Sequence, residues 1–160
     1  MKADAPQCAP MTGKTRIHAL RLLGAFLAGD DHYRASAAPY GDGGPQALER
    51  ALDLFLARPE LGFVWLACRG DTALGACVVC YAISTSRGTL VAKLDDVTVA
   101  ASARGEGIGA AMLASLIAHL RAGGVTRIDT ACHRANAGAW RFYERLGFRP
   151  LDEERLALLI

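Results

Sequence analysis

Three glycines alternate with other residues in Arg104–Ala110, at the start of a stretch with helical periodicity. Gly105, Gly107 and Gly109 remove three side chains from a turn, so the backbone there can approach a ligand closely. The helix that begins at this turn adds unpaired backbone N–H groups and the positive end of its dipole. This arrangement is typical of a site for a phosphate or a pyrophosphate.

Acidic and phenolic side chains elsewhere in the chain could carry proton transfers. Asp95 and Asp96 are adjacent in the strand expected before the turn, and Tyr143 lies in a later helix. A carboxylate can accept a proton from an amine, and a phenol is protonated at neutral pH and can donate one. Neighbouring strand residues face opposite ways, so only one carboxylate is expected to enter a cleft. Asp95 shares a face with Val97 and Val99 in a regular strand, and a β-bulge would change that assignment.

This combination of residues resembles the GCN5-related N-acetyltransferase superfamily. The pyrophosphate loop of that superfamily reads Arg/Gln-x-x-Gly-x-Gly/Ala, which Arg104, Gly107 and Gly109 match. The segment Leu94–Val99 resembles its bulged central strand, and Asn136–Phe148 resembles its last helix and following strand. The three matches together are a specific signal, whereas any one of them alone would be weak.

The resemblance covers about Phe63–Phe148 and implies an enzyme that transfers an acetyl group from acetyl-CoA directly to a primary amine. It implies that Tyr143 protonates the departing sulfur and that Asp95 or Asp96 accepts the amine proton. Similar acidic pairs occur in relatives that acetylate polyamines and other diamines, so a small cationic amine is the expected acceptor. The residues expected to bind the donor are Val97, Thr98, Val99, Arg104, Gly105, Glu106, Gly107, Ile108, Gly109, Ala110, Asn136, Ala139 and Tyr143.

Three other functions stay open at this point. The chain could acetylate a protein lysine or N-terminus, or it could bind acyl-CoA without catalysis. Gly105–Ala110 also fits the dinucleotide fingerprint G-x-G-x-x-G/A, and Asp129 lies about where an acidic ribose-binding residue is expected. The dinucleotide turn follows its strand tightly, however, whereas Ala100–Arg104 separates the strand from the first glycine here.

The elements that must position these residues follow from hydrophobic periodicity. Two helices come first, then three strands, and then helices alternate with strands, which indicates an α/β fold. With the resemblance, this order implies a mixed, mostly antiparallel central sheet with a splayed central strand and helices on both faces. The expected elements are helices Ile17–Leu27, Gln46–Ala57, Gly107–Ala122 and Ala137–Leu146, and strands Phe63–Cys68, Gly75–Ile83, Leu90–Val99, Val125–Ala131 and Arg155–Ile160.

Composition and charge indicate a single domain over residues 1–160, with residues 1–14 as a tail or a weak edge strand. Hydrophobic residues make up 52% of the chain, and the formal net charge is +2. So small a charge argues against a dedicated nucleic-acid binder. No apolar run approaches membrane-spanning length, so no membrane partner is expected. Dimers are common among relatives, which makes a homodimer a further expectation.

The five cysteines indicate neither a disulfide framework nor a metal site. An odd number in a chain of this size favours reduced thiols. Cys77 and Cys80 have C-x-x-C spacing, but residues three apart in a strand point to opposite faces. We expect two small buried side chains and no bound metal. Because Met1–Met11 has no signal-peptide pattern either, the expected location is cytoplasmic.

Weaker candidates lie between the first two expected helices, a region that contributes to the acceptor pocket in relatives. These residues are Asp30, Asp31, His32, Tyr33 and Tyr40. Cys132 and His133 would suggest a thiol nucleophile only if they faced each other, which neighbours at a strand end rarely do.

Overall fold

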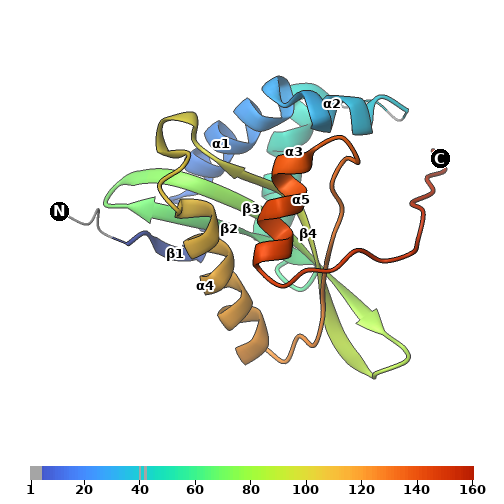
Figure 1. The fold of residues 1–160 in the computed structure, drawn as a ribbon. Coiled ribbons are helices and arrows are strands. Elements are labelled where there is room, and N and C mark those ends of the chain that lie inside the picture. The colour runs from blue at the N-terminus through green and yellow to red at the C-terminus, as the bar shows by residue number, and fades with distance from the viewer. Residues whose placement is uncertain (1–4, 40, 42) are drawn as a thin grey trace.

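The structure, a computed structural model, describes residues 5–39, 41 and 43–160. Its strands form one sheet in the order β1-β2-β3-β4-β5 (Figure 1). Neighbouring strands are antiparallel except for β4 and β5, which are parallel. The predicted mixed, mostly antiparallel sheet is therefore confirmed. The strands are β1 Gln7–Pro10, β2 Gly62–Arg69, β3 Thr72–Ser84, β4 Thr89–Val99 and β5 Ile128–Thr130.

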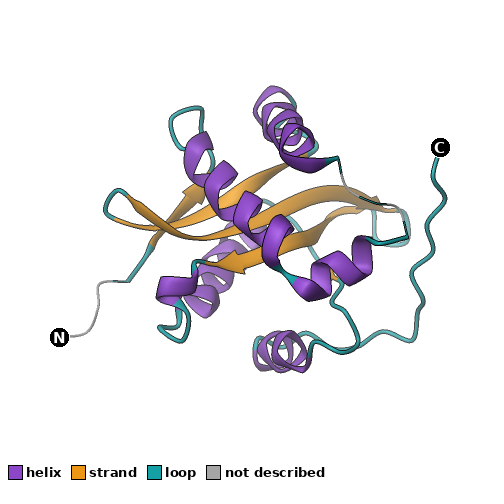
Figure 2. Cartoon of the chain, turned by 90° about the horizontal axis from the view of Figure 1, so that it is seen from above, coloured by secondary structure: helices purple, strands orange, loops and turns teal. Residues whose placement is uncertain are grey.

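Helices cover both faces of the sheet (Figure 2), which was also predicted. α1 and α3 pack on one face, whereas α4 packs on the other, with part of α5 against the same cluster. None of the described helices has the length and apolarity needed to cross a membrane. The helices are α1 Arg16–Gly29, α2 Asp31–Ala37, α3 Gly44–Ala57, α4 Ile108–Ala122 and α5 Ala137–Arg145, with a short 3-10 turn at Ala101–Ala103.

Each face of the sheet has its own hydrophobic cluster because side chains alternate along a strand. On the α4 side, Met112 and Leu116 of α4 are fully buried against strand residues. On the other side, Leu52 of α3 is buried within a second cluster. Cys77 belongs to the first cluster and Cys80 packs against the second. The prediction that these two thiols point to opposite faces is therefore confirmed.

A β-bulge interrupts β4 at the acidic pair. Ala76 pairs with Thr98, but Val78 already pairs with Asp95, so β4 has one residue more than β3 between these pairs. Asp96 takes up the extra length with a left-handed backbone, at φ 51°. Aspartate tolerates this conformation better than most residues do.

The bulge also changes which side chains share a face. Asp95 pairs with Val78, whose side chain lies in the cluster under α1 and α3. Val97 and Val99 pack instead against the cluster under α4. Asp95 would share a face with these valines only in a regular strand, and the extra residue of the bulge reverses the alternation between them.

A short helix occupies part of the segment between α1 and α3, where the sequence predicted no element. Asp30 begins α2 as an N-cap, since its Oδ1 accepts a hydrogen bond from the Tyr33 backbone N–H at 2.7 Å. The cap residue is a helix signal, but seven residues without a clear apolar stripe give little periodicity to detect.

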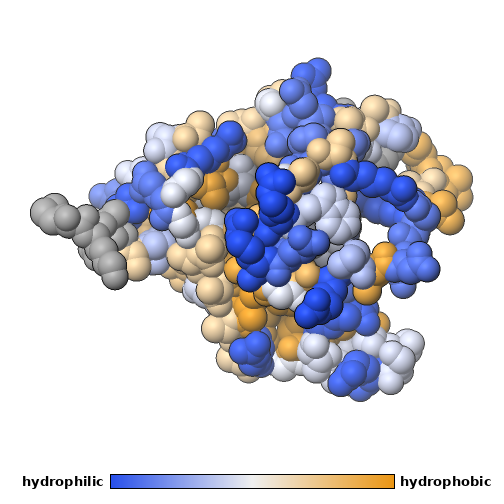
Figure 3. Space-filling model, in the orientation of Figure 1, coloured by the Kyte–Doolittle hydropathy of each residue, from blue (hydrophilic) through white to orange (hydrophobic). Residues whose placement is uncertain are grey.

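The predicted closing strand at Arg155–Ile160 is wrong, because residues 149–160 contain no strand. Leu156, Leu158 and Ile160 alternate as strand residues do, but a strand also needs a hydrogen-bonded neighbour. Leu156 is 91% exposed and Leu158 is 88% exposed. Figure 3 shows a gap between part of this tail and the rest of the molecule.

Candidate active site

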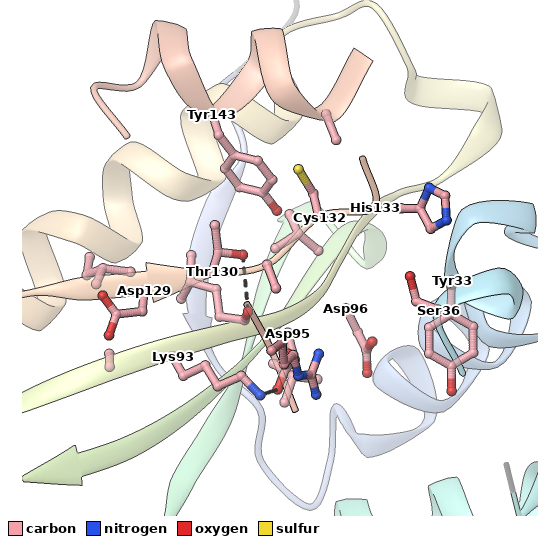
Figure 4. A pocket seen from close by; sticks show the side chains of 18 of the residues that line it. Tyr33, Ser36, Lys93, Asp95, Asp96, Asp129, Thr130, Cys132, His133 and Tyr143 are labelled. Atoms are coloured by element: carbon pink, nitrogen blue, oxygen red, sulfur yellow. Dashed lines mark hydrogen bonds and ion pairs between the residues drawn. The ribbon is translucent and has the colours of Figure 1, made fainter. Parts of the chain in front are cut away.

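The cleft begins where β4 and β5 part. Their parallel ladder ends at the pair Leu94 and Thr130. Beyond this pair β4 bulges and continues to the glycine turn, while the chain after β5 continues to α5. Residues from both branches line one large cleft, which extends to α2 (Figure 4). The splay of the central strand, expected from the resemblance, is therefore present.

The glycine turn forms a cradle at the beginning of α4. Gly105 and Gly107 have φ values of 81° and 79°, a left-handed conformation that other residues adopt only with strain. Gly107 is the N-cap of α4 and supplies no side-chain cap. The N–H groups of the first helical turn are therefore available to an anion. These N–H groups belong to Ile108, Gly109 and Ala110.

The side chains around this cradle suit an anionic ligand. Glu106 is the acidic residue of the turn, and its carboxylate is paired with Arg69 at 3.2 Å. Arg104 is exposed, and its Nε donates to the Val99 carbonyl at 3.4 Å.

A Cβ atom at Gly109 would lie 3.4 Å from Val99 and from the ring of Phe142. This glycine therefore lets α4 pack closely on β4 and α5, beside the cradle.

Asp96 is the carboxylate with the most altered acidity in the cleft. Burial and the neighbouring Asp95 charge raise its pKa from 3.8 to about 6, and Lys93 opposes that change. A carboxylate with this pKa is mostly ionised at neutral pH yet binds a proton readily. Asp96 faces the cleft from the bulge (Figure 4).

Asp95 has a different environment, although it also lines the cleft. Its Oδ2 accepts a bond from the Lys93 ammonium at 3.0 Å. The two acidic residues of the pair therefore differ in environment: Asp95 is paired with a lysine, whereas Asp96 has a raised pKa.

Tyr143 reaches the cleft from α5. Burial raises the pKa of its phenol to about 12, and a hydrogen bond with Thr130 opposes that rise. Its ring makes edge contacts with Phe142 and Phe148, each with 5.3 Å between ring centroids. Packing thus fixes a phenol that stays protonated and can donate to a ligand.

Asn136 is the N-cap of α5, because its side-chain oxygen accepts a hydrogen bond from the Ala139 N–H at 3.0 Å. Both residues line the cleft. The side-chain NH₂ of Asn136 has donors that the cap does not use. A contact with a ligand is therefore compatible with the capping role.

The end of the cleft near α2 combines side chains from two distant segments. Figure 4 shows Tyr33 and Ser36 of α2 on the same side as Asp96. His32 contacts His133, which follows β5, with 5.4 Å between ring centroids. Three of the weaker acceptor-side candidates, Asp30, His32 and Tyr33, therefore line the cleft.

The weak candidates also have other roles or places. Asp30 caps α2, and Asp31 is an exposed residue of its first turn. Tyr40 lies outside the described residues. Burial raises the pKa of the Cys132 thiol, which disfavours a thiolate nucleophile.

Three residues of the cleft, Lys93, Ser36 and Thr130, were not predicted from the sequence. Lys93 lies two residues before Asp95 on the same strand and forms an ion pair with it, whereas Thr130 comes into the cleft through its pairing with Leu94. Ser36 belongs to the unpredicted α2. No local motif marks these three positions, so knowledge of the register and of α2 was needed to find them.

The fold and the cleft define an acyltransferase of the CoA-dependent kind, and comparison with known proteins identifies the family. The model of the Acetyltransferase (GNAT) family matches residues 30–148. The chain therefore belongs to the GNAT family of acetyltransferases.

Solved structures with the same fold come from varied sources. An integron cassette protein from the mobile metagenome of Cole Harbour Salt Marsh is 25% identical, with a TM-score of 0.74, over 96% of this chain and 90% of its own. Ribosomal-protein-alanine N-acetyltransferase from Brucella melitensis biovar Abortus 2308 is 14% identical, with a TM-score of 0.76, over 98% and 100%. Glucosamine-6-phosphate N-acetyltransferase from Arabidopsis thaliana is 12% identical, with a TM-score of 0.71, over 98% and 100%.

The fold excludes the dinucleotide-binding alternative. A dinucleotide fold needs a parallel, doubly wound sheet, whereas this sheet has one parallel pair of strands. Asp129 is also bound to Arg127 of the same segment, at 2.9 Å. The family model covers the glycine turn, and the GNAT family generally uses acetyl-CoA.

Proposed function

We propose that this chain transfers an acetyl group from acetyl-CoA directly to a primary amine of a small molecule. One observation carries the proposal: Asp96 and Tyr143 line the same cleft at the point where β4 and β5 part. A proton acceptor for the amine and a proton donor for the sulfur are the two groups that this reaction needs.

Acetyl-CoA would be held partly by the glycine cradle and partly by the cleft that begins at Val97. The glycine cradle, from Arg104 to Ala110, would hold the pyrophosphate through backbone N–H groups and the positive end of α4. Backbone groups of Val97, Thr98 and Val99 lie where β4 has left β5, and they would hold the pantetheine arm with Asn136. When bound, acetyl-CoA supplies an activated acetyl group as a thioester.

Asp96 would take the proton of the attacking amine. An ionised carboxylate attracts an ammonium ion and then accepts its proton, directly or through a water molecule. The pKa of about 6 keeps most of the group ionised at neutral pH. Asp95 would support this role by its charge, which contributes to the raised pKa of Asp96.

Tyr143 would protonate or hydrogen-bond the departing sulfur. A phenol with a pKa of about 12 remains protonated at every physiological pH. Its hydroxyl lies across the split from the bulge, so the two proton transfers occur at separate walls of the cleft (Figure 4).

A polyamine or another diamine is the acceptor class that the acidic pair favours. Asp95 and Asp96 lie next to each other in the cleft, and anionic residues attract cationic amines. Lys93 neutralises part of this charge through Asp95, so Asp96 would bind the reacting nitrogen.

Two alternatives share the same donor site. A protein lysine or N-terminus could replace the small amine, or the domain could bind acyl-CoA without catalysis. A basic carboxylate and a protonated phenol in one cleft favour catalysis, because binding alone requires neither. The contact between His32 and His133 across the α2 end favours a small acceptor over an extended peptide.

The proposal is tested by incubating the protein with acetyl-CoA and a panel of acceptors. The panel contains monoamines, diamines, polyamines, a lysine peptide and peptides with free N-termini, and mass spectrometry identifies acetylated products. We expect an N-acetylated small amine together with free CoA. Tight acetyl-CoA binding without an acetylated product would contradict the proposal, and acetylation of peptides alone would favour the protein-directed alternative.

Two further parts of the proposal concern the protein in its surroundings. A cytoplasmic location is supported by the five cysteines, all of which are free thiols as in a reducing compartment. A homodimer is proposed by analogy with relatives, and sedimentation at several protein concentrations tests it.

A further inference from the structure

Thr130 lies at the point where the parallel ladder ends and the cleft begins. It pairs with Leu94 in the last register position that β4 and β5 share. Its hydroxyl also donates a hydrogen bond to the Leu94 carbonyl at 3.2 Å. Figure 4 shows this bond, and it shows the Tyr143 hydroxyl of α5 near the same threonine, whose hydrogen bond lowers the pKa of the phenol. One side chain thus joins the end of the ladder to the proposed proton donor.

We propose that Thr130 is a positioning residue that holds the Tyr143 phenol in the cleft and stabilises its oxygen when the proton leaves. The inference rests on the proposed function, because Thr130 would act on the reaction only through Tyr143.

The chemistry of a hydroxyl allows both parts of this role. A threonine hydroxyl has one proton and two acceptor lone pairs. While its proton is bonded to the Leu94 carbonyl, a lone pair can accept the hydrogen bond of the phenol and hold it in place. When the phenol proton moves away, the threonine proton can turn from the carbonyl to the phenolate oxygen.

Two protons move in the transfer step, and the proton held by Asp96 must return to Tyr143 through water before the next turnover. Tyr143 gives its proton to the sulfur, which keeps the electron pair of the broken carbon–sulfur bond. Asp96 takes the proton that the amine loses as the new carbon–nitrogen bond forms. Thr130 changes only its hydrogen-bond partner and neither gains nor loses a proton.

The burial of Tyr143 explains why such a partner is needed. Burial raises the pKa of this phenol, whereas the hydrogen bond with Thr130 lowers it. A thiol has a pKa of about 8.5, so proton transfer from a buried phenol to a thiolate is unfavourable. A donor to the phenolate reduces that cost at the step where the charge develops.

The test compares Thr130→Val, which removes the hydroxyl at nearly constant shape, with Thr130→Ser, which keeps it. Thr126→Val is the matched control, because the Thr126 hydroxyl shares a hydrogen bond with Thr89 at 2.7 Å. This bond also links β4 to the segment of β5, but at the opposite end of the ladder from Leu94. Each variant is measured with and without Tyr143→Phe.

We expect Thr130→Val to lower kcat about tenfold, the effect of one lost hydrogen bond, with KM for acetyl-CoA within twofold. Thr130→Ser should keep most of the wild-type kcat, and Thr126→Val should have the wild-type kcat. In the Tyr143→Phe background, Thr130→Val should cause no further loss, since the residue through which it acts is gone.

A purely structural role for Thr130 gives a different pattern. Equal losses in both backgrounds, or a Thr130→Ser loss as large as that of Thr130→Val, would overturn the inference. Thr130→Ala serves for the same comparison if Thr130→Val does not fold. Wild-type protein without amine-dependent turnover would overturn the proposed function and this inference together, whereas additive losses in an active enzyme overturn this inference alone.

Discussion

At the scale of single residues, Asp96 combines an unusual backbone with an unusual acidity. The bulge gives it a left-handed conformation, and burial beside Asp95 raises its pKa to about 6. Both features are unfavourable for the folded chain at neutral pH and favourable for a base in a cleft. We therefore expect ionised Asp96 to lower the free energy of unfolding while it serves as the base.

The stability cost of Asp96 predicts that Asp96→Asn stabilises the protein at high pH. The folded-state pKa, about 6, lies above the reference value of 3.8. The stability that this group contributes is therefore complete below pH 3.8 and is lost as pH rises through about 6. Asparagine stays neutral and tolerates the left-handed backbone. Denaturant titrations should show Asp96→Asn more stable than wild type by on the order of 2–3 kcal/mol at pH 8.

This gain should shrink as pH falls toward 5, where wild-type Asp96 is largely protonated. A stabilisation of equal size at both pH values would show that the carboxylate charge is not its cause.

The same substitution should remove a limb of the pH–rate profile. As a base, Asp96 must be ionised, so kcat at saturating acetyl-CoA and amine should fall as pH drops through about 6. Asp96→Asn should lower kcat at pH 8 by about 100-fold and abolish this limb. Asp95→Asn is the matched comparison and should lower kcat less, because Asp95 is engaged with Lys93. A larger loss for Asp95→Asn would reverse the assignment of the two residues.

At the scale of elements, the site depends on how β4 leaves its neighbours. The glycine turn was predicted from residue types and spacing, and the roles of the acidic pair and the tyrosine followed from the resemblance to the GNAT superfamily. The side-chain directions of the pair were not, because the bulge at Asp96 depends on pairing with β3. Thr130 was missed for the same reason: its role depends on its position opposite Leu94. Local sequence indicates which residues can react, and strand register decides which of them meet.

Two glycines at opposite ends of α4 allow a matched test of whether the glycine cradle binds the pyrophosphate. Gly107 at the beginning of α4 and Gly124 just after its end both have left-handed backbones, at φ 79° and 83°. A Cβ atom added to either glycine would meet nothing within 4 Å, so alanine brings backbone strain without a clash. Each alanine variant should lose about 1–2 kcal/mol of folding free energy.

Only Gly107→Ala should also weaken acetyl-CoA binding, measured by calorimetry, because Gly124 lies at the other end of α4. If both variants bound acetyl-CoA as tightly as wild type, the cradle would not be the pyrophosphate site.

At the scale of the whole molecule, the cleft is bounded by segments from most of the chain. Residues of α1, α2, β4, β5 and α5 line it. The three central strands were predicted well because strong apolar runs mark β2, β3 and β4. The tail was predicted poorly, since the alternation of Leu156, Leu158 and Ile160 says nothing about which strand edge would pair with it.

A ligand held between these separate segments should stabilise the fold as a unit. Acetyl-CoA at about 100 times its Kd should stabilise the protein by about 2.7 kcal/mol, a rise in melting temperature of roughly 5–10 °C. An acetyl-pantetheine thioester, which lacks the pyrophosphate, should give a smaller shift at equal concentration. Equal shifts for the two compounds would mean that the cradle on α4 contributes nothing to binding.

The central claim is that acyl transfer takes place between Asp96 and Tyr143 in this cleft, and the rate of free CoA release tests it most directly. With the best small amine, wild-type protein should release CoA only when the amine is present. Tyr143→Phe should lower kcat by at least about tenfold while the Kd of acetyl-CoA stays within about twofold. Unchanged turnover in Tyr143→Phe, or CoA release that does not depend on an amine, would contradict the account.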